Sequence, residues 1–196
     1  DYYEDGLMDQ GRLPRRVLRE AREELGEYAY AGQYLQSPVP LSGGMFRCDK
    51  VRIESGAPVM RQVVRYWDKA GTEKGEGAYT VGVKMGVDSD RRYWVLDVVR
   101  GRWEAGERER TIRQTAELDG RNVIIGVEQE PGSGGKESAQ GTVRMLAGFR
   151  CRMHRPTGDK AVRADPYAVQ VNVGNVVLVV GAWNRAYLEE LQYFPA

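Results

Sequence analysis

The sequence predicts an α/β protein whose mixed β-sheet, an antiparallel meander followed by parallel strands, is flanked by helices. Three strand-like segments follow one another between residues 63 and 99. After them, segments with a helical apolar period alternate with short apolar runs that are typical of strands. A chain of 196 residues with 41% hydrophobic content can bury one good core. We therefore expect one domain with an appendage.

The appendage is predicted to be residues 1–55, and the domain residues 56–196. Within the appendage, "PRRVLREAREEL" (14–25) favours a helix, because Pro14 suits a first helical turn and Gly26 can end the helix. The prolines and paired glycines of "EYAYAGQYLQSPVPLSGGMF" (27–46) then indicate an extended arm or ordered linker.

The domain is expected to begin with a meander. Strands are predicted at 63–68, 78–86 ("AYTVGVKMG") and 92–99 ("RYWVLDVV"). The stretch "VDSDR" supplies the turn between the last two of these strands. Strands that follow one another so closely pair in antiparallel order.

From residue 105 onward the pattern alternates. "AGERERTIRQTAEL" (105–118) predicts a helix, and the apolar run "NVIIGVE" (122–128) predicts a strand that is covered on both faces. These two segments form a right-handed crossover. A helix at 137–147, a strand at 149–153, a helix at 160–173, a strand at 175–180 and a helix at 183–191 complete the prediction.

Composition excludes several classes of function. The formal charge of +1 gives no global signal for nucleic acid, so DNA contacts must come from a local basic surface. Cys48 and Cys151 show no CxxC spacing. No apolar stretch approaches the roughly 18 residues of a membrane span, and the first residues lack the features of a signal peptide, so we expect a soluble protein without membrane contact. The single histidine, His154, argues against histidine-based zinc sites.

Two predicted strands end on acids. Asp68 ends the first strand of the meander and Glu128 ends the crossover strand, and ligands gather outside the carboxyl ends of such strands. Glu130 follows two residues after Glu128 and would project to the same side. Clustered carboxylates repel one another unless a divalent cation neutralises them, which points to Mg²⁺ or Mn²⁺. Alternatively, each acid is a solvated turn residue.

Two further segments carry positive charge. In "EPGSGGKES" (130–138), Glu137 stands where a nucleotide-binding loop needs a hydroxyl residue, which excludes an ATPase loop. Lys136 can still assist phosphate binding at a glycine-rich turn, although a simple sharp turn is the alternative. The segment 150–164, "RCRMHRPTGDKAVRA", concentrates basic residues that can contact a DNA backbone. These are Arg150, Arg152, His154, Arg155, Lys160 and Arg163, with Thr157 or Asp159 as a candidate helix cap.

An ordered set of motifs from Tyr34 onward resembles the carboxyl-terminal nuclease domain of tailed-bacteriophage terminase large subunits. The motifs are "YLQSPVPLSGGMF", "RYWDKAGT", "YTVGVKMG", "YWVLDVVRGRWEAGERE", "IIGVEQEPGSGGK" and "RPTGDKAVRADPYAVQVNVGNVVLV". The resemblance implies a ribonuclease H-like fold and a metal-dependent endonuclease that cuts concatemeric double-stranded DNA by a two-metal mechanism. It implies metal positions at Asp68 and Glu128. From the residues themselves, Glu130 is a further metal candidate, and Lys136, Arg152, Arg155, Lys160 and Arg163 are the predicted DNA-binding residues.

The resemblance also implies partners and differences. In the complete motor, the partners would be a portal and a small terminase subunit, and the place of action would be the host cytoplasm. No Walker A sequence occurs, so residues 1–55 resemble only the end of the family's ATPase region and its linker. The third acidic motif of the family is expected beyond Ala196. The alternatives are a nuclease that resolves Holliday junctions and a non-catalytic docking module of the packaging motor.

Overall fold

The computed structural model describes residues 11–21, 34, 44–70 and 77–194. Its seven-stranded sheet has the order β1-β7-β4-β3-β2-β5-β6. The strands are β1 (Arg52–Glu54), β2 (Gln62–Asp68), β3 (Thr80–Val87), β4 (Tyr93–Gly101), β5 (Ile124–Glu128), β6 (Arg150–His154) and β7 (Val176–Val179). The helices are α2 (Ala105–Asp119), α3 (Ser133–Met145), α4 (Lys160–Asn172) and α5 (Asn184–Tyr193), with a 3₁₀ turn η1 (Cys48–Lys50) before the sheet.

The pairing pattern confirms the predicted mixed sheet. Strands β2, β3 and β4 form the antiparallel meander. Strand β5 is parallel to β2, and β6 is parallel to β5. On the other side, β7 is parallel to β4 and β1 is parallel to β7. The β2–β5 junction is therefore the place where the antiparallel part of the sheet meets a parallel part.

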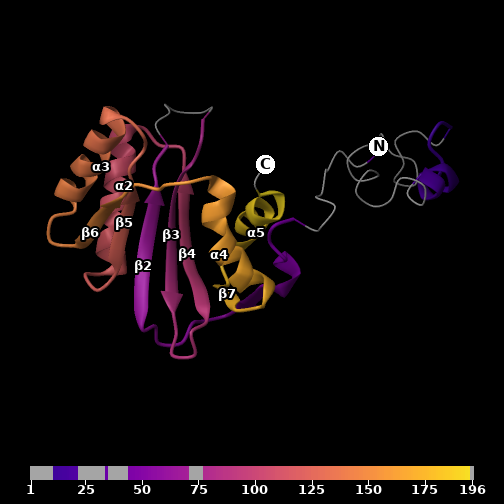
Figure 1. Cartoon of the computed structure of the whole chain (residues 1–196), viewed down its shortest axis with the longest axis horizontal. Helices are drawn as coiled ribbons and strands as arrows, with labels where there is room; N and C mark the ends of the chain where they lie inside the picture. Colours follow the sequence, from indigo (N-terminus) through magenta and orange to yellow (C-terminus); the bar gives the residue numbers. More distant parts are fainter. Residues whose placement is uncertain (1–10, 22–33, 35–43, 71–76, 195–196) are drawn as a thin grey trace.

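Helices cover both faces of the sheet, but over different strands (Figure 1). Trp67 and Val127 belong to one core cluster, which α2 and α3 close with residues such as Ile112 and Ala139. On the other face, Val95, Val176 and Leu178 pack against α4 and α5. Because side chains alternate along a strand, Tyr66 and Asp68 of β2 point to the α4–α5 side and Trp67 to the α2–α3 side.

A buried ion-pair network anchors β2 on the α2 side. The Arg65 guanidinium, only 2% exposed, donates to both carboxylate oxygens of Asp119 at 2.8 and 3.0 Å and to Asp97 at 2.7 Å. Lys84 adds a second cation at 2.9 Å from Asp119. These contacts lower the pKa of Asp119 against the opposing effect of burial. The strand that ends on Asp68 is therefore tied to α2, to its neighbour β3 and, through Asp97, to β4.

The amino-terminal segment contributes more to the sheet than its sequence suggests. Residues 15–21 are helical, as predicted, and the Leu18 amide donates to the Pro14 carbonyl at 3.1 Å. However, β1 adds an edge strand at Arg52–Glu54, ahead of the residue at which we expect the domain to begin. Phe46 is also buried against the α4–α5 side. The predicted arm 27–46 lies largely outside the described residues.

The other boundaries agree with the predictions within a few residues, apart from α3. This helix begins at Ser133 rather than at residue 137. A Cβ at Gly135 would lie 2.4 Å from the Glu130 carbonyl oxygen, so the helix start packs against the chain that leaves β5. This contact supports the sharp-turn interpretation of the glycine-rich segment. At α4, the Asp159 side chain accepts from the Ala161 amide at 2.8 Å, so Asp159 is the cap.

Across the described residues, no helix combines the length and the apolar character needed to cross a bilayer.

Candidate functional site

The two predicted acids meet at one end of the β2–β5 junction. In the parallel pairing Trp67 lies opposite Val127, and each of these residues is followed by one of the acids, Asp68 or Glu128. Both acids end their strands, and both side chains leave the sheet on the side opposite to Trp67 and Val127. The structure therefore brings together two carboxylates that are far apart in the sequence.

Each carboxylate is harder to ionise than an isolated one. Partial desolvation raises the pKa of Asp68, and the nearby Glu130 carboxylate raises it further. Partial desolvation also raises the pKa of Glu128, and the Asp68 carboxylate adds to this effect. The cations Lys160 and Arg163 oppose the shift at Asp68 but do not cancel it. A bound dication would reduce the repulsion between carboxylates that are held close together in this way.

The donor set fits a hard cation with few protein ligands. Within the part of the chain that the structure describes, no three His, Cys, Asp or Glu side chains are grouped closely enough to hold a metal ion. Mg²⁺ is commonly held by one or two carboxylates and keeps several waters. Asp68 and Glu128 can supply those carboxylates, and Glu130 is close enough to affect Asp68 electrostatically.

Tyr66 is a site residue that the sequence analysis missed. Its hydroxyl oxygen lies 3.0 Å from His154 Nδ1, and the Glu128 carboxylate is close enough to affect it electrostatically. Burial and the nearby carboxylates Glu128 and Asp68 raise the pKa of Tyr66 to about 12, so the phenol is protonated at neutral pH. The alternation of β2, which puts residues 66 and 68 on one face, was the signal that could have found it.

Basic residues surround the acids from two elements. The edge strand β6 pairs with β5 so that Arg152 lies opposite Gly126 and His154 opposite Glu128. From α4, Lys160 and Arg163 act electrostatically on Asp68. Arg155 is exposed on the segment between β6 and α4. Four of the five predicted DNA-binding residues therefore belong to β6, to α4 or to the segment between them.

The fifth, Lys136, belongs to a different layer. It is exposed on α3, whose buried residue Ala139 packs in the same cluster as Trp67, on the α2–α3 side of the sheet. Its amide donates to the Gly132 carbonyl within the first turn of α3. The helix starts near the end of β5, but its packing separates Lys136 from the face that carries Arg152 and Tyr66.

Lys69, directly after Asp68, is buried beneath the site and was not predicted. Its ammonium group donates to Thr142 Oγ1 at 2.7 Å and to Ser138 Oγ at 2.8 Å on α3, and it lies 3.4 Å from Glu109 of α2. Burial lowers its pKa, while the Glu109 carboxylate opposes this shift. Lys69 thus ties the end of β2 to both helices of this layer.

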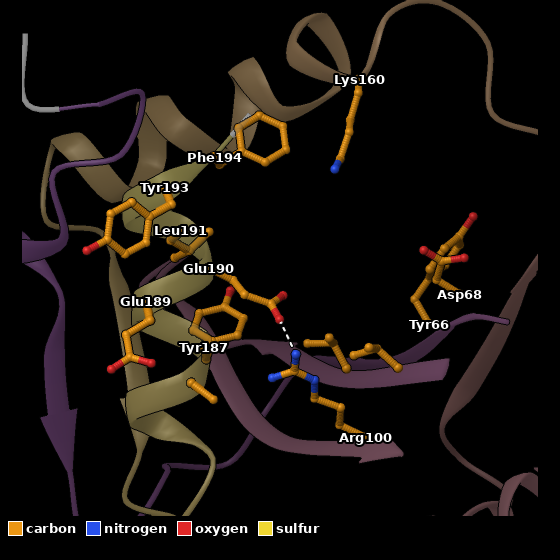
Figure 2. A pocket seen from close by; sticks show the side chains of 13 residues that line it. Tyr66, Asp68, Arg100, Lys160, Tyr187, Glu189, Glu190, Leu191, Tyr193 and Phe194 are labelled. Carbon is orange, nitrogen blue, oxygen red and sulfur yellow. Dashed lines mark ion pairs between the residues drawn. The ribbon is translucent and has the colours of Figure 1, made fainter. Parts of the chain in front are cut away.

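An open cleft of about 680 Å³ lies beside Asp68, between the sheet and the α4–α5 layer (Figure 2). Lys160 points into the cleft from α4, across from Asp68 and Tyr66. An ion pair of 2.7 Å between Arg100 and Glu190 lies along its wall, and Tyr187, Leu191 and Phe194 supply an apolar side. The cleft combines an acid, cations and aromatic rings, as a nucleic-acid surface does.

Comparisons with known proteins agree with this architecture. A family model described as "Terminase RNaseH-like domain" matches residues 65–196. No curated protein matches the chain in sequence.

Solved structures of phage terminases have a similar fold. A large terminase from a thermophilic bacteriophage is 11% identical with a TM-score of 0.56, and the match covers 95% of this chain and 46% of that chain. The chain thus spans about half the length of that terminase. The large terminase nuclease of the thermophilic phage G20c with bound magnesium is 12% identical with a TM-score of 0.53, over 78% of this chain and 81% of that chain. The same nuclease with bound cobalt gives 12% identity and a TM-score of 0.52, over 79% and 82% of the two chains.

The family match covers the meander from residue 65 onward, the crossover strand and both carboxylates, and it confirms the fold and the resemblance predicted from the sequence. The chain therefore belongs to the terminase RNaseH-like domain family.

Proposed function

We propose that this chain is a metal-dependent DNA endonuclease that cuts concatemeric double-stranded DNA during viral packaging. The observation that carries the proposal is the pair Asp68 and Glu128, held side by side at the β2–β5 junction with raised pKa values and cations around them. The family match and the nuclease structures of similar fold support the same reaction class.

In this proposal Asp68 and Glu128 hold Mg²⁺ or Mn²⁺, and Glu130 assists from the chain beyond β5. Such an ion, once bound, lowers the pKa of a coordinated water and stabilises the charge that develops on the phosphate oxygens. A second ion, as the sequence analysis predicts, would need ligands in addition to these. Structures of a G20c nuclease with magnesium and with cobalt support a divalent ion in a protein of this fold.

The protein's own cations position the DNA. Lys160 and Arg163 of α4 act electrostatically on Asp68, Arg152 lies on β6 opposite Gly126, and Arg155 is exposed between these two elements. Their contacts with phosphates would fix the register of the duplex without reading its bases. Lys136 remains a prediction from the sequence alone. A portal and a small terminase subunit are proposed as partners in a complete motor, which would act in the host cytoplasm.

Plasmid cleavage tests the proposal. Supercoiled plasmid should be nicked and linearised with Mg²⁺ or Mn²⁺ and left intact with EDTA. Asp68→Asn and Glu128→Gln should each lower the rate at least about a hundredfold, because each removes a charged metal ligand. Asp165→Asn, a change at an exposed carboxylate of α4, is the matched control and should cleave as the wild type does.

Three results would contradict the proposal. Wild-type rates in a folded Asp68→Asn variant would show that the metal is held elsewhere. Absence of cleavage by the wild type with either ion would favour a docking module. A strong preference for four-way junctions over linear duplex would instead assign the activity to junction resolution.

A further inference from the structure

Arg100 of β4 lies on the same face of the sheet as Asp68, two strands away. In the register of the sheet Asp68 pairs with Val81 of β3, and Val81 pairs with Arg100. Residues that lie directly opposite each other share a face, so all three project toward the α4–α5 side. Two strand spacings separate the Cα atoms of Asp68 and Arg100 by about 10 Å. Both residues line the open cleft described above.

An aromatic ring holds the Arg100 guanidinium in place. The Arg100 Cζ atom lies 3.7 Å from the ring centroid of Tyr79, which directly precedes β3. Arg102, just after β4, has its Cζ atom 4.1 Å from the same centroid. This stacking is favourable because the face of an aromatic ring attracts cations. The ring therefore orients the Arg100 side chain independently of α5.

Glu190 of α5 covers the Arg100 guanidinium from the opposite wall of the cleft. Its Oε1 atom lies 2.7 Å from Arg100 Nη2, and Figure 2 shows this ion pair between the helix and the sheet. The Arg100 side chain is 31% exposed and the Glu190 side chain 63%, and ion pairs this exposed contribute little to stability. A guanidinium binds phosphate with the same paired geometry as carboxylate. A phosphate that enters the cleft can therefore take the place of Glu190.

We propose that Arg100 is a DNA phosphate contact that Glu190 masks until DNA enters the cleft. This inference rests on the proposed nuclease function and extends its DNA surface from β6 and α4 across the meander. Lys160 points into the same cleft from α4, so cations face the DNA from the helix layer and from the sheet. Successive phosphates of one strand advance about 3.4 Å along the duplex axis, so a phosphate at Arg100 lies within a few nucleotides of one at Asp68.

Two simpler roles of Glu190 make different predictions. If the ion pair only holds α5 against the sheet, loss of Glu190 should lower stability and leave DNA binding unchanged. If Glu190 only repels DNA, its loss should strengthen binding whether or not Arg100 is present. If Glu190 masks Arg100, its loss should strengthen binding only in a chain that retains Arg100.

Fluorescence anisotropy with one duplex, in EDTA and over a series of salt concentrations, tests the contact. Arg100→Ala should flatten the slope of log K against log salt by about 0.9, because one phosphate contact is lost. If the affinities converge at about 1 M salt, binding should weaken about eightfold at about 0.1 M. Arg100→Lys keeps the positive charge and should keep the slope. Arg110→Ala, at an exposed arginine of α2, is the matched control and should bind as the wild type does.

The same assay tests the mask. Glu190→Gln should strengthen binding about twofold to fivefold at low salt, which is the range expected for release of an exposed ion pair. This gain should disappear when Glu190→Gln is combined with Arg100→Ala. Glu117→Gln removes the acid of a 2.8 Å ion pair with Arg113 on α2, with the same change in net charge. It is the matched control and should keep the affinity of the wild type.

Thermal melting first shows that each variant is folded. A wild-type salt slope in folded Arg100→Ala would overturn the contact and leave the nuclease proposal intact. The mask would be overturned if Glu190→Gln gave no gain beyond that of Glu117→Gln, or if its gain persisted in full together with Arg100→Ala. If the wild type binds no duplex, the proposed function fails together with this inference.

Discussion

The basic surface formed by Arg152, Lys160 and Arg163 leads to a quantitative prediction. Lys160 and Arg163 act electrostatically on Asp68 from α4, and Arg152 lies on β6 opposite Gly126. If each neutralises one phosphate, replacing all three by alanine should flatten the slope of log K against log salt by about 2.7, since each phosphate contributes about 0.9. With an unchanged affinity at about 1 M salt, binding should weaken roughly 500-fold at about 0.1 M salt and only about sixfold at about 0.5 M.

Fluorescence anisotropy with two duplexes of unrelated sequence, in EDTA so that no cleavage occurs, measures this effect. Both duplexes should lose affinity equally, because phosphate contacts carry no base information. The matched control replaces three other exposed arginines by alanine, which gives the same change in net charge. These are Arg110 on α2, Arg144 on α3 and Arg121 before β5. Equal losses in the two triple variants would refute a localised surface, and an unchanged slope in the first would place the DNA elsewhere.

Three other variants test the electrostatics and packing of β2. Asp68→Asn should stabilise the metal-free protein at neutral pH, because the raised pKa of Asp68 means that its ionised form is disfavoured in the folded state. This gain in stability should vanish below about pH 4, where Asp68 is protonated in both the folded and the unfolded state. Thermal melting of both proteins in EDTA across this pH range measures it. A lower melting temperature for Asp68→Asn than for the wild type at pH 7 would contradict the reasoning. Asp119→Ala should cost about 3 kcal/mol in denaturant unfolding, because it leaves the buried Arg65 with less charge compensation. In the wild type, the stabilisation by Asp119 should be lost as the pH falls through its lowered pKa. A cost of Asp119→Ala below about 1 kcal/mol would contradict the reasoning. Gly82→Ala would place a Cβ 2.6 Å from the buried Trp67 ring and should cost about 1–3 kcal/mol, whereas unchanged stability would show that the ring can move.

Much of the fold was predictable because its signals are local. The alternation in 63–68 and the apolar run in 122–128 identify β2 and β5, and the acid at the end of each identifies a common sheet edge. By contrast, all three residues of β1 are exposed, so this strand has no buried side to mark it in the sequence. Its place in the sheet depends on its pairing with β7, far away in the sequence.

The supporting parts of the site were not predictable for the same reason. Tyr66 meets His154 only because β6 lies beside β5, and Lys69 contacts Ser138 and Thr142 only because α3 packs behind β2. Local patterns identify candidate ligands, whereas the groups that hold them depend on contacts between distant segments. Gly126 illustrates the difference, since an added Cβ there would lie 2.6 Å from the Tyr66 ring, a contact that no local pattern indicates.

The position of β2 between an antiparallel and a parallel neighbour has a consequence for how the protein acquires activity. Its pairing with β3 joins segments that are close in the sequence, whereas its pairing with β5 must wait for the α2 crossover to close a much longer loop. A chain that has formed only the meander carries Asp68 without Glu128. Incompletely folded molecules thus lack the paired acids, and under our proposal a nascent chain cannot cut DNA before its sheet is complete.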